Sequence, residues 1–398
     1  MNGTKRRVTA LTMFAMTVVG CGGSADTTTA ATEQTTAAVE QTTAAAEQTT
    51  AAAEATTTTP EETTAATEET TPETREVTLA LSTTSVFGYG YWIALDQGFY
   101  AEEGLDVALQ GTGGSSDVAQ ILAANNAEAG MGVPGAMLPA IQAGANLYPF
   151  FTYAYGEVFD VVVPEESELQ AIADLEGLTI GISELAGGEV PLLRALLVEA
   201  GFDPDADVEI IEIGTDAPSV SNALEQGRID AYSSAKADIA AMNAVGLGTR
   251  SIAPESLSTL PAEGLLATEE TKDDIDLLGR IGRATAKGQL VAYTSQDAAV
   301  CILKNQIPEE FTDDTAGRES LASVVEITTA PMRDDGAYEF GFLDAEGWNT
   351  YVEIFKQGGI ISEDIDMSEL VLPDALDIIN DFDQQEIVDL ANSLPTDC

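Results

Sequence analysis

From Val77 onward, short apolar runs alternate with longer amphipathic stretches. Strands of a covered sheet read as short apolar runs, whereas helices show a 3.6-residue period, so this alternation predicts an α/β fold. The predicted strands lie at 77–81, 105–109, 131–133, 148–155, 159–163, 179–183, 208–213, 229–233 and 264–267. Beyond Lys272 the pattern is almost wholly helical. We therefore expect a two-lobed clamshell, with lobe 1 formed by 76–160 and 264–398 and lobe 2 by 161–263. The chain would cross between lobes near 160–163 and 264–267.

The N-terminus is typical of a secretory signal. Three basic residues within the first seven precede an apolar run at 8–19, which is shorter than the ~20 residues that span a bilayer. The run ends at Val18-Val19-Gly20-Cys21, which resembles a bacterial lipobox. This pattern predicts a signal peptide at 1–20 and acylation of Cys21. The lipid would anchor the protein to the outer face of the cell membrane; the alternative location is the periplasm. The alternative is an ordinary signal peptide in which Cys21 has no role.

Residues 21–75 consist largely of Thr, Ala, Glu and Gln, and a Glu-Gln-Thr-Thr-Ala-Ala unit places an acid every seven residues from Glu33 to Glu54. Ala, Thr and Val side chains between the acids bury too little apolar surface to offset the entropy of ordering. We expect a disordered tether, which leaves roughly 320 residues for the folded part.

Charge and residue usage exclude several classes of function. Of 67 acidic and 16 basic residues, ten acids and four bases precede Glu76, so the remainder carries a net charge of −45. Nucleic acid is therefore not an expected partner. The acidity fits either a surface adapted to salt or attraction of a cationic solute. The chain has no histidine, which removes the commonest catalytic base and metal ligand. We expect no metal and no cofactor.

Two cysteines, Cys301 and Cys398, remain once Cys21 is assigned to lipid. In an oxidising compartment they either pair or stay as free thiols. A disulfide between them would stabilise the fold by roughly 4 to 5 kcal/mol in the chain-entropy model.

Several segments resemble the solute-binding proteins of ABC importers in the sulfonate, taurine, nitrate and thiamine-pyrimidine group. They are WIALDQGFYAEEGLDV at 92–107, DLEG at 174–177 before TIG at 179–181, ALEQGRIDA at 223–231, SQDAAV at 295–300 with IPE at 307–309, and GW at 347–348 with GGII at 358–361. The resemblance runs in order across nearly all of 77–372. It implies the periplasmic binding protein type 2 fold, a small-molecule solute, and a membrane permease with its ATPase as partners. It implies no enzymatic activity and does not specify the ligand.

Ligands of open α/β sheets sit at the carboxyl ends of strands, against loops that lead into helices. In this chain those loops are 82–90, 113–117, 134–136, 183–189 and 215–217. The candidate ligand-binding residues in or beside them are Tyr89, Tyr91, Ser115, Ser116, Pro134, Tyr155, Ser183, Glu184, Glu189, Asp216 and Lys236. Each serine at 115–116 is equally a helix cap, and the tyrosines are equally core residues.

The five loops hold no Lys or Arg, while acids and aromatics lie in or beside them. This composition favours a pyrimidine-like or amine-bearing nitrogen compound, held by carboxylates and ring stacking. A sulfonate, taurine or nitrate is the alternative, because helix N-termini alone can hold an anion. Some relatives build the thiamine pyrimidine and consume their own histidine, which this chain lacks. A sensor or scavenger without an importer is a third reading.

Overall fold

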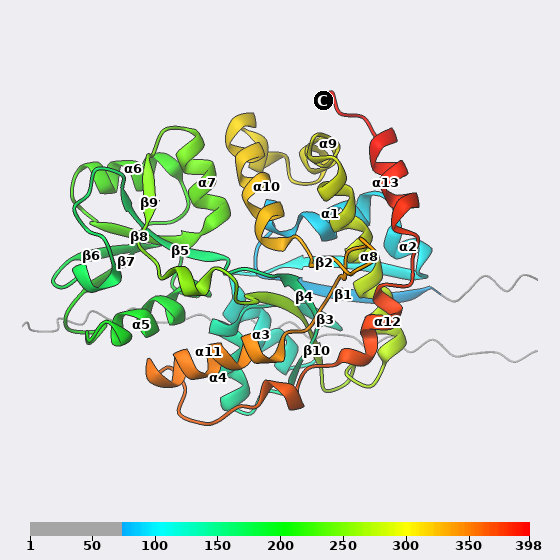
Figure 1. Cartoon of the computed structure of the whole chain (residues 1–398), viewed down its shortest axis with the longest axis horizontal. Helices are drawn as coiled ribbons and strands as arrows, with labels where there is room; N and C mark the ends of the chain where they lie inside the picture. The colour runs from blue at the N-terminus through cyan, green and yellow to red at the C-terminus, as the bar shows by residue number, and fades with distance from the viewer. Residues whose placement is uncertain (1–73) are drawn as a thin grey trace, which may run out of the picture. The chain divides into compact units, whose positions relative to one another are not determined.

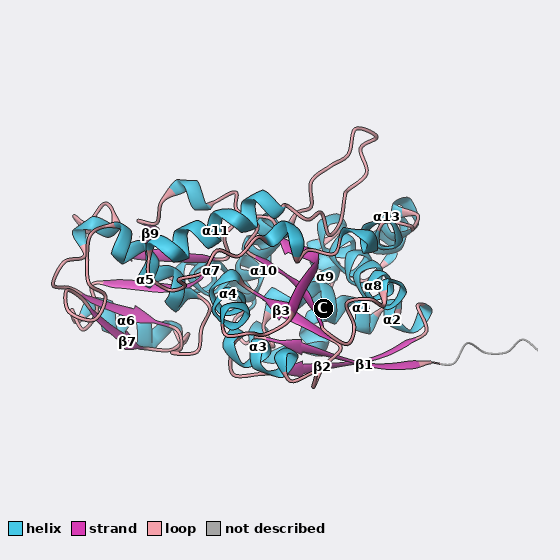
Figure 2. Ribbon diagram, turned by 90° about the horizontal axis from the view of Figure 1, so that it is seen from below, coloured by secondary structure: helices cyan, strands magenta, loops and turns pink. Residues whose placement is uncertain are grey.

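The computed structural model describes residues 74–398 of the chain (Figure 1). The predicted signal peptide, the lipid site at Cys21 and the predicted tether up to residue 73 lie outside this range. Two mixed five-stranded sheets with helices packed around the strands make up the described part (Figure 2). The predicted α/β class is confirmed. None of the helices within 74–398 is both long and apolar enough to cross a membrane.

The first sheet has the strand order β2-β1-β3-β10-β4. Its strands are β1 (Arg75–Leu81), β2 (Leu105–Gly111), β3 (Ala129–Gly132), β4 (Leu147–Ala154) and β10 (Glu263–Thr268). β1 pairs in parallel with β2 and β3, whereas β10 is antiparallel to both β3 and β4. The helices that connect its strands are α1 (Tyr89–Asp96), α2 (Phe99–Glu102), α3 (Ser115–Ala123) and α4 (Pro134–Gln142).

The second sheet repeats this plan with the order β7-β6-β8-β5-β9. Its strands are β5 (Phe159–Pro164), β6 (Thr179–Ile182), β7 (Glu209–Glu212), β8 (Ala231–Ala235) and β9 (Thr249–Ser251). Here β5 is the antiparallel strand, between β8 and β9. The α-helices of this region are α5 (Glu189–Glu199), α6 (Ala217–Glu225) and α7 (Lys236–Ala244). Each sheet therefore receives one antiparallel strand that follows a crossing of the chain.

Helices dominate after β10, as the sequence predicts. They are α8 (Ile275–Thr294), α9 (Gln296–Gln306), α10 (Asp314–Thr328), α11 (Ala345–Gln357), α12 (Leu376–Ile379) and α13 (Gln384–Ser393). Short 3-10 turns occur at Val86–Gly88, Ile172–Asp174, Glu255–Leu257, Pro308–Phe311, Met367–Glu369 and Pro373–Ala375. α8 packs against α1, α12 and α13, while α10 packs against α7 and α11 against α5. The C-terminal helices thus support the first sheet and also reach the second.

Apolar side chains of both sheets and of the C-terminal helices merge into one large buried core. A smaller cluster around Val220, Tyr232 and Met242 lies on the second sheet alone, beneath α6 and α7. The chain passes from β4 to β5 through 155–158 and returns to β10 through 252–262. The predicted crossing segments 160–163 and 264–267 themselves lie inside β5 and β10.

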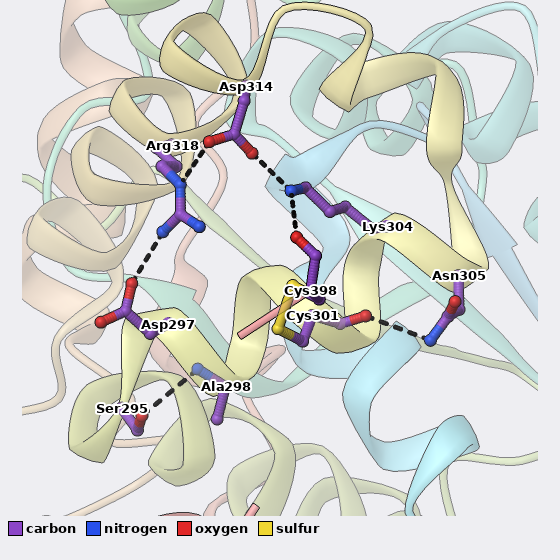
Figure 3. The surroundings of a disulfide bond; sticks show 9 residues. All are labelled: Ser295, Asp297, Ala298, Cys301, Lys304, Asn305, Asp314, Arg318 and Cys398. Atoms are coloured by element: carbon purple, nitrogen blue, oxygen red, sulfur yellow. Dashed lines mark hydrogen bonds and ion pairs between the residues drawn. A yellow bond between two sulfur atoms is a disulfide. The ribbon is translucent and has the colours of Figure 1, made fainter. Parts of the chain in front are cut away.

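A disulfide joins Cys301, in α9, to Cys398, at the C-terminus (Figure 3). Beside it Lys304 pairs with Asp314 at 2.6 Å, and its Nζ also donates to the Cys398 carbonyl oxygen at 3.3 Å. Arg318 joins Asp314 to Asp297. The C-terminus is therefore fastened to α9, and Lys304 also links α9 to α10.

Candidate functional site

A cleft of about 350 Å³ lies between the loops of the two sheets. From the first sheet it receives the loop 82–87 after β1, Thr112 and Ser115 before and at the start of α3, and Glu263 at the start of β10. From the second it receives 158–159, 183–184, 188–189, 214–215, and Ala235, Ala237 and Asp238. Most of these segments follow carboxyl ends of parallel strands, as the sequence predicts for a ligand site.

Hydroxyl groups and helix starts form one part of the lining. Four consecutive hydroxyl residues at 82–85 follow β1, and Ser115 is the first residue of α3 and is buried. Gly114 before it has φ 137°, and a Cβ there would stand 2.8 Å from Glu184 Oε1. Only a glycine allows this turn and lets the second sheet's loop come so close.

Carboxyl groups form the other part, contributed by Glu184, Glu189, Asp238, Glu263 and Glu310. Ser183 Oγ donates to Glu189 Oε1, Ser234 Oγ donates to Asp238 Oδ2 at 3.0 Å, and the Val86 N–H donates to Glu310 Oε2 at 3.3 Å. Within the described residues no Lys or Arg lines the cleft. The aromatic rings of Phe87 and Phe159 supply apolar walls.

Burial is the main cause that raises the pKa of all five carboxyl groups. The pKa of Asp238 rises to about 7, with further contributions from the negative charges of Glu310, Glu189 and Glu184. The pKa of Glu184 is raised further by Glu189. All five groups lie in a low-dielectric region, and Glu184, Glu189 and Glu310 repel Asp238 when ionised. A positive ligand would therefore lower the free-energy cost of ionising these acids in the cleft.

Four of the eleven predicted ligand residues line this cleft: Ser115, Ser183, Glu184 and Glu189. The other seven do not. Ser116 lies in a separate groove between α3 and α4. Pro134 is buried in the first turn of α4, Asp216 caps α6 by accepting from the Ser219 N–H at 3.0 Å, and Lys236 begins α7.

Tyr89 and Tyr91 lie in the core of the first lobe, and the half-buried Tyr155 packs against that core; none of the three lines the cleft. Tyr89 is fully buried, and its hydroxyl is 2.7 Å from Thr328 Oγ1. Tyr91 stacks on Tyr153 with ring centroids 4.8 Å apart. Tyr155 Oη accepts a hydrogen bond from the Gly341 N–H at 2.8 Å. The aromatic wall predicted from them is supplied instead by phenylalanines.

Among the lining residues that were not sequence candidates are two aromatic residues, Phe87 and Phe159, and three acids, Asp238, Glu263 and Glu310. Phe87 falls inside the predicted loop 82–90, so that signal was present. Asp238 follows β8 at the start of α7, which the same carboxyl-end rule could have selected. Glu263 and Glu310 come from the return part of the chain, where no local pattern marks a ligand site. Within residues 74–398 no three carboxyl or thiol groups lie close enough together to hold a metal ion.

Comparison with known proteins identifies the family of this two-sheet protein. Residues 88–299 match the family model described as NMT1/THI5 like, which is just over half of the chain. The chain belongs to the NMT1/THI5-like family. No curated protein sequence matches it. The family match confirms the predicted resemblance at the level of the NMT1/THI5-like family.

Solved structures resemble this NMT1/THI5-like protein along most of their length. A protein of Bordetella bronchiseptica RB50 is 18% identical with a TM-score of 0.61, over 77% of this chain and 98% of that one. The periplasmic aliphatic sulphonate binding protein SsuA of Escherichia coli is 14% identical with a TM-score of 0.58, over 75% and 92%. The periplasmic nitrate-binding protein NrtA of Synechocystis PCC 6803 is 10% identical with a TM-score of 0.53, over 81% and 99%. The shared feature is the periplasmic binding protein fold.

Proposed function

We propose that this protein is the solute-binding component of an ABC-type importer. It captures a pyrimidine-like or amine-bearing nitrogen compound between its two lobes and delivers it to a membrane permease with its ATPase, without chemical change. The observation that carries this proposal is the cleft between the two sheets, where hydroxyls, helix starts and carboxyl groups from both sides meet. Such a concave site with few polar groups is what small-molecule recognition requires.

The preference for a nitrogen compound rests on charge. The described residues lining the cleft include five carboxyl groups and no basic side chain. Carboxylates form strong hydrogen bonds with protonated amines. Phe87 and Phe159 also line the cleft, and aromatic rings attract cations. An anionic solute would add a further negative charge to groups that already repel one another.

A sulfonate, taurine or nitrate is the second candidate. SsuA and NrtA, which share the fold, are named as binding proteins for aliphatic sulphonate and nitrate. The starts of α3 and α5 both lie at the cleft, and free N–H groups at helix starts hold anions. An enzyme of thiamine-pyrimidine synthesis is a remote alternative, because such an enzyme consumes a histidine and this sequence has none.

A thermal-unfolding screen of the purified protein against amines, pyrimidines, sulfonates and nitrate tests the proposal. A ligand at 100 times its Kd adds about 2.7 kcal/mol to the free energy of unfolding. We expect stabilisation by nitrogen cations or pyrimidines, and its loss in Glu189→Gln but not in the control Glu199→Gln, an exposed acid at the end of the same helix. Stabilisation by sulfonates alone would contradict the proposed solute class.

Two lobes between which the chain crosses at two segments are expected to close on the solute. We place the connections at 155–158 and 252–262, between the strands of the two sheets. Closure needs contacts that exist only when both lobes touch the ligand, and Ser115 from one side and Ser183 from the other meet that need. Small-angle scattering should give a smaller radius of gyration at saturating solute. An unchanged radius with tight binding would mean that the site is preformed.

The proposal includes a lipid anchor at Cys21, supported by the lipobox-like sequence that follows the apolar run. Cys21→Ser should leave the protein soluble or unprocessed when it is produced in a bacterial host that lipidates exported proteins. Membrane fractionation after washing measures this. Equal membrane association of the serine variant and the parent would rule out acylation at this residue.

A further inference from the structure

The carboxyl groups of the cleft come from several chain segments and from both sheets. Glu184 and Glu189 flank the loop that starts α5, and Asp238 lies in the first turn of α7. Glu263 begins β10 of the first sheet, and Glu310 lies in the 3-10 turn Pro308–Phe311 before α10. The negative charge is thus distributed around the cleft.

Two pairs can be recognised among these groups. Glu189 Oε1 accepts hydrogen bonds from Ser183 Oγ and, at 3.4 Å, from the Glu184 N–H. This places the first pair, Glu184 and Glu189, on one loop. The charge that most strongly raises the pKa of Asp238 is that of Glu310, ahead of Glu189 and Glu184. Both residues line the cleft: Asp238 comes from α7 beside the second sheet, and Glu310 comes from the turn before α10 and accepts from the Val86 N–H after β1. This second pair therefore spans the boundary between the lobes.

Glu263 provides an independent sign that a ligand belongs here. Its side chain is only 2% exposed, lines the cleft, and its Oε1 has no hydrogen-bond partner among the described residues. Buried polar atoms of folded proteins almost always have a partner, so an unpaired carboxyl oxygen beside a cavity calls for a donor from the cavity. A protonated amine is such a donor.

Resting on the proposed function, we propose that the solute carries two cationic nitrogen centres, one bound by Glu184 and Glu189 and the other by Asp238 and Glu310, with Glu263 accepting a further hydrogen bond from it. A solute with one positive charge would neutralise one pair and leave the other pair repelling in a low-dielectric cleft. A short linear diamine or a guanidino amine satisfies both pairs and fits within about 350 Å³. Because one pair spans the lobes, the second nitrogen also links them.

Calorimetric titration of the full protein with diamines of three to six carbons, and with the monoamines of equal length, tests this inference. We expect the best diamine to bind at least about 30-fold more tightly than its monoamine, since each charge-assisted contact adds to the affinity. Glu310→Gln should weaken diamine binding about tenfold or more and change monoamine binding less than about threefold. Glu319→Gln, an exposed acid of α10 outside the cleft, is the matched control and should change neither.

Proton release gives a readout that is separate from affinity. A bound dication favours the ionised carboxylates, so binding near pH 6.5 should release protons, detected as a dependence of the heat on the ionisation enthalpy of the buffer. Equal binding of monoamine and diamine would overturn the two-centre inference while the amine-binding function stands. Binding of a sulfonate with proton uptake, and of no amine, would overturn the proposed solute class itself. Binding of Ca²⁺ or Mg²⁺ without any diamine, or of no ligand in the panel, would also overturn the inference.

Discussion

Asp238 should make the stability of the empty protein fall as the pH rises. Burial and nearby negative charges raise its pKa from an ordinary 3.8 to about 7. Between these two pH values the folded protein keeps a proton on Asp238 that the unfolded chain has lost. The contribution of this proton to the free energy of unfolding is fully present below pH 3.8 and is lost as the pH rises through about 7. At about 1.4 kcal/mol for each unit of pKa difference, ionised Asp238 costs the folded state about 4 kcal/mol above pH 7.

The substitution Asp238→Asn removes this cost and keeps an oxygen that can accept from Ser234 Oγ. We expect the variant to be more stable than the parent by up to about 4 kcal/mol at pH 8, and equal to it within about 0.5 kcal/mol near pH 4. Urea unfolding of the full chain at pH 4, 6, 7 and 8, followed by circular dichroism, measures the difference. Asp273→Asn, an exposed aspartate, is the control. A stability difference that is the same at all four pH values would refute the assigned pKa.

The same variant should bind the solute more weakly, because it removes one carboxylate from the cleft. A gain in stability together with a loss of binding would show that the buried acid is kept for recognition at the expense of stability. If Asp238→Asn gained stability and kept full affinity, Asp238 would have no part in binding.

Cys398→Ser opens a disulfide that spans 97 residues, and the chain-entropy model predicts a loss of about 4.7 kcal/mol; urea unfolding measures it, and unchanged stability would contradict the model. Tyr351→Phe removes a 2.6 Å hydrogen bond to the buried carboxylate of Glu157. It should cost about 1–3 kcal/mol at pH 7, and an unchanged unfolding midpoint would mean that Glu157 finds another partner. Gly135→Ala would place a Cβ 2.5 Å from the Gly188 carbonyl oxygen. It should hold the lobes apart, so that solute binds more weakly and scattering shows a larger radius of gyration; parental affinity would contradict this.

Much of the architecture could be predicted from local sequence. Apolar runs such as 77–81 and 179–183 match β1 and β6 to within a few residues, because a strand covered on both faces needs consecutive apolar side chains. β9 was not predicted, since Thr249–Ser251 is short and polar and carries no apolar signal. The insertion of β10 between β3 and β4 is also invisible in the sequence, because it joins residues more than a hundred positions apart.

Some residues of the candidate site could also be predicted from local sequence, and others could not. Ser115, Ser183 and Glu189 could be predicted, because the turn from the end of a parallel strand into a helix is a local feature that faces the ligand. The direction of Tyr89 and Tyr91 could not, since it depends on α8 and β4, which pack against their helix only in the folded chain. Glu263 and Glu310 line the cleft only because the chain returns to the first sheet, with Glu263 at the start of β10 and Glu310 in the turn before α10. Their carboxyl groups acquire raised pKa values only there, because desolvation and repulsion depend on distances in space and not on separation along the chain.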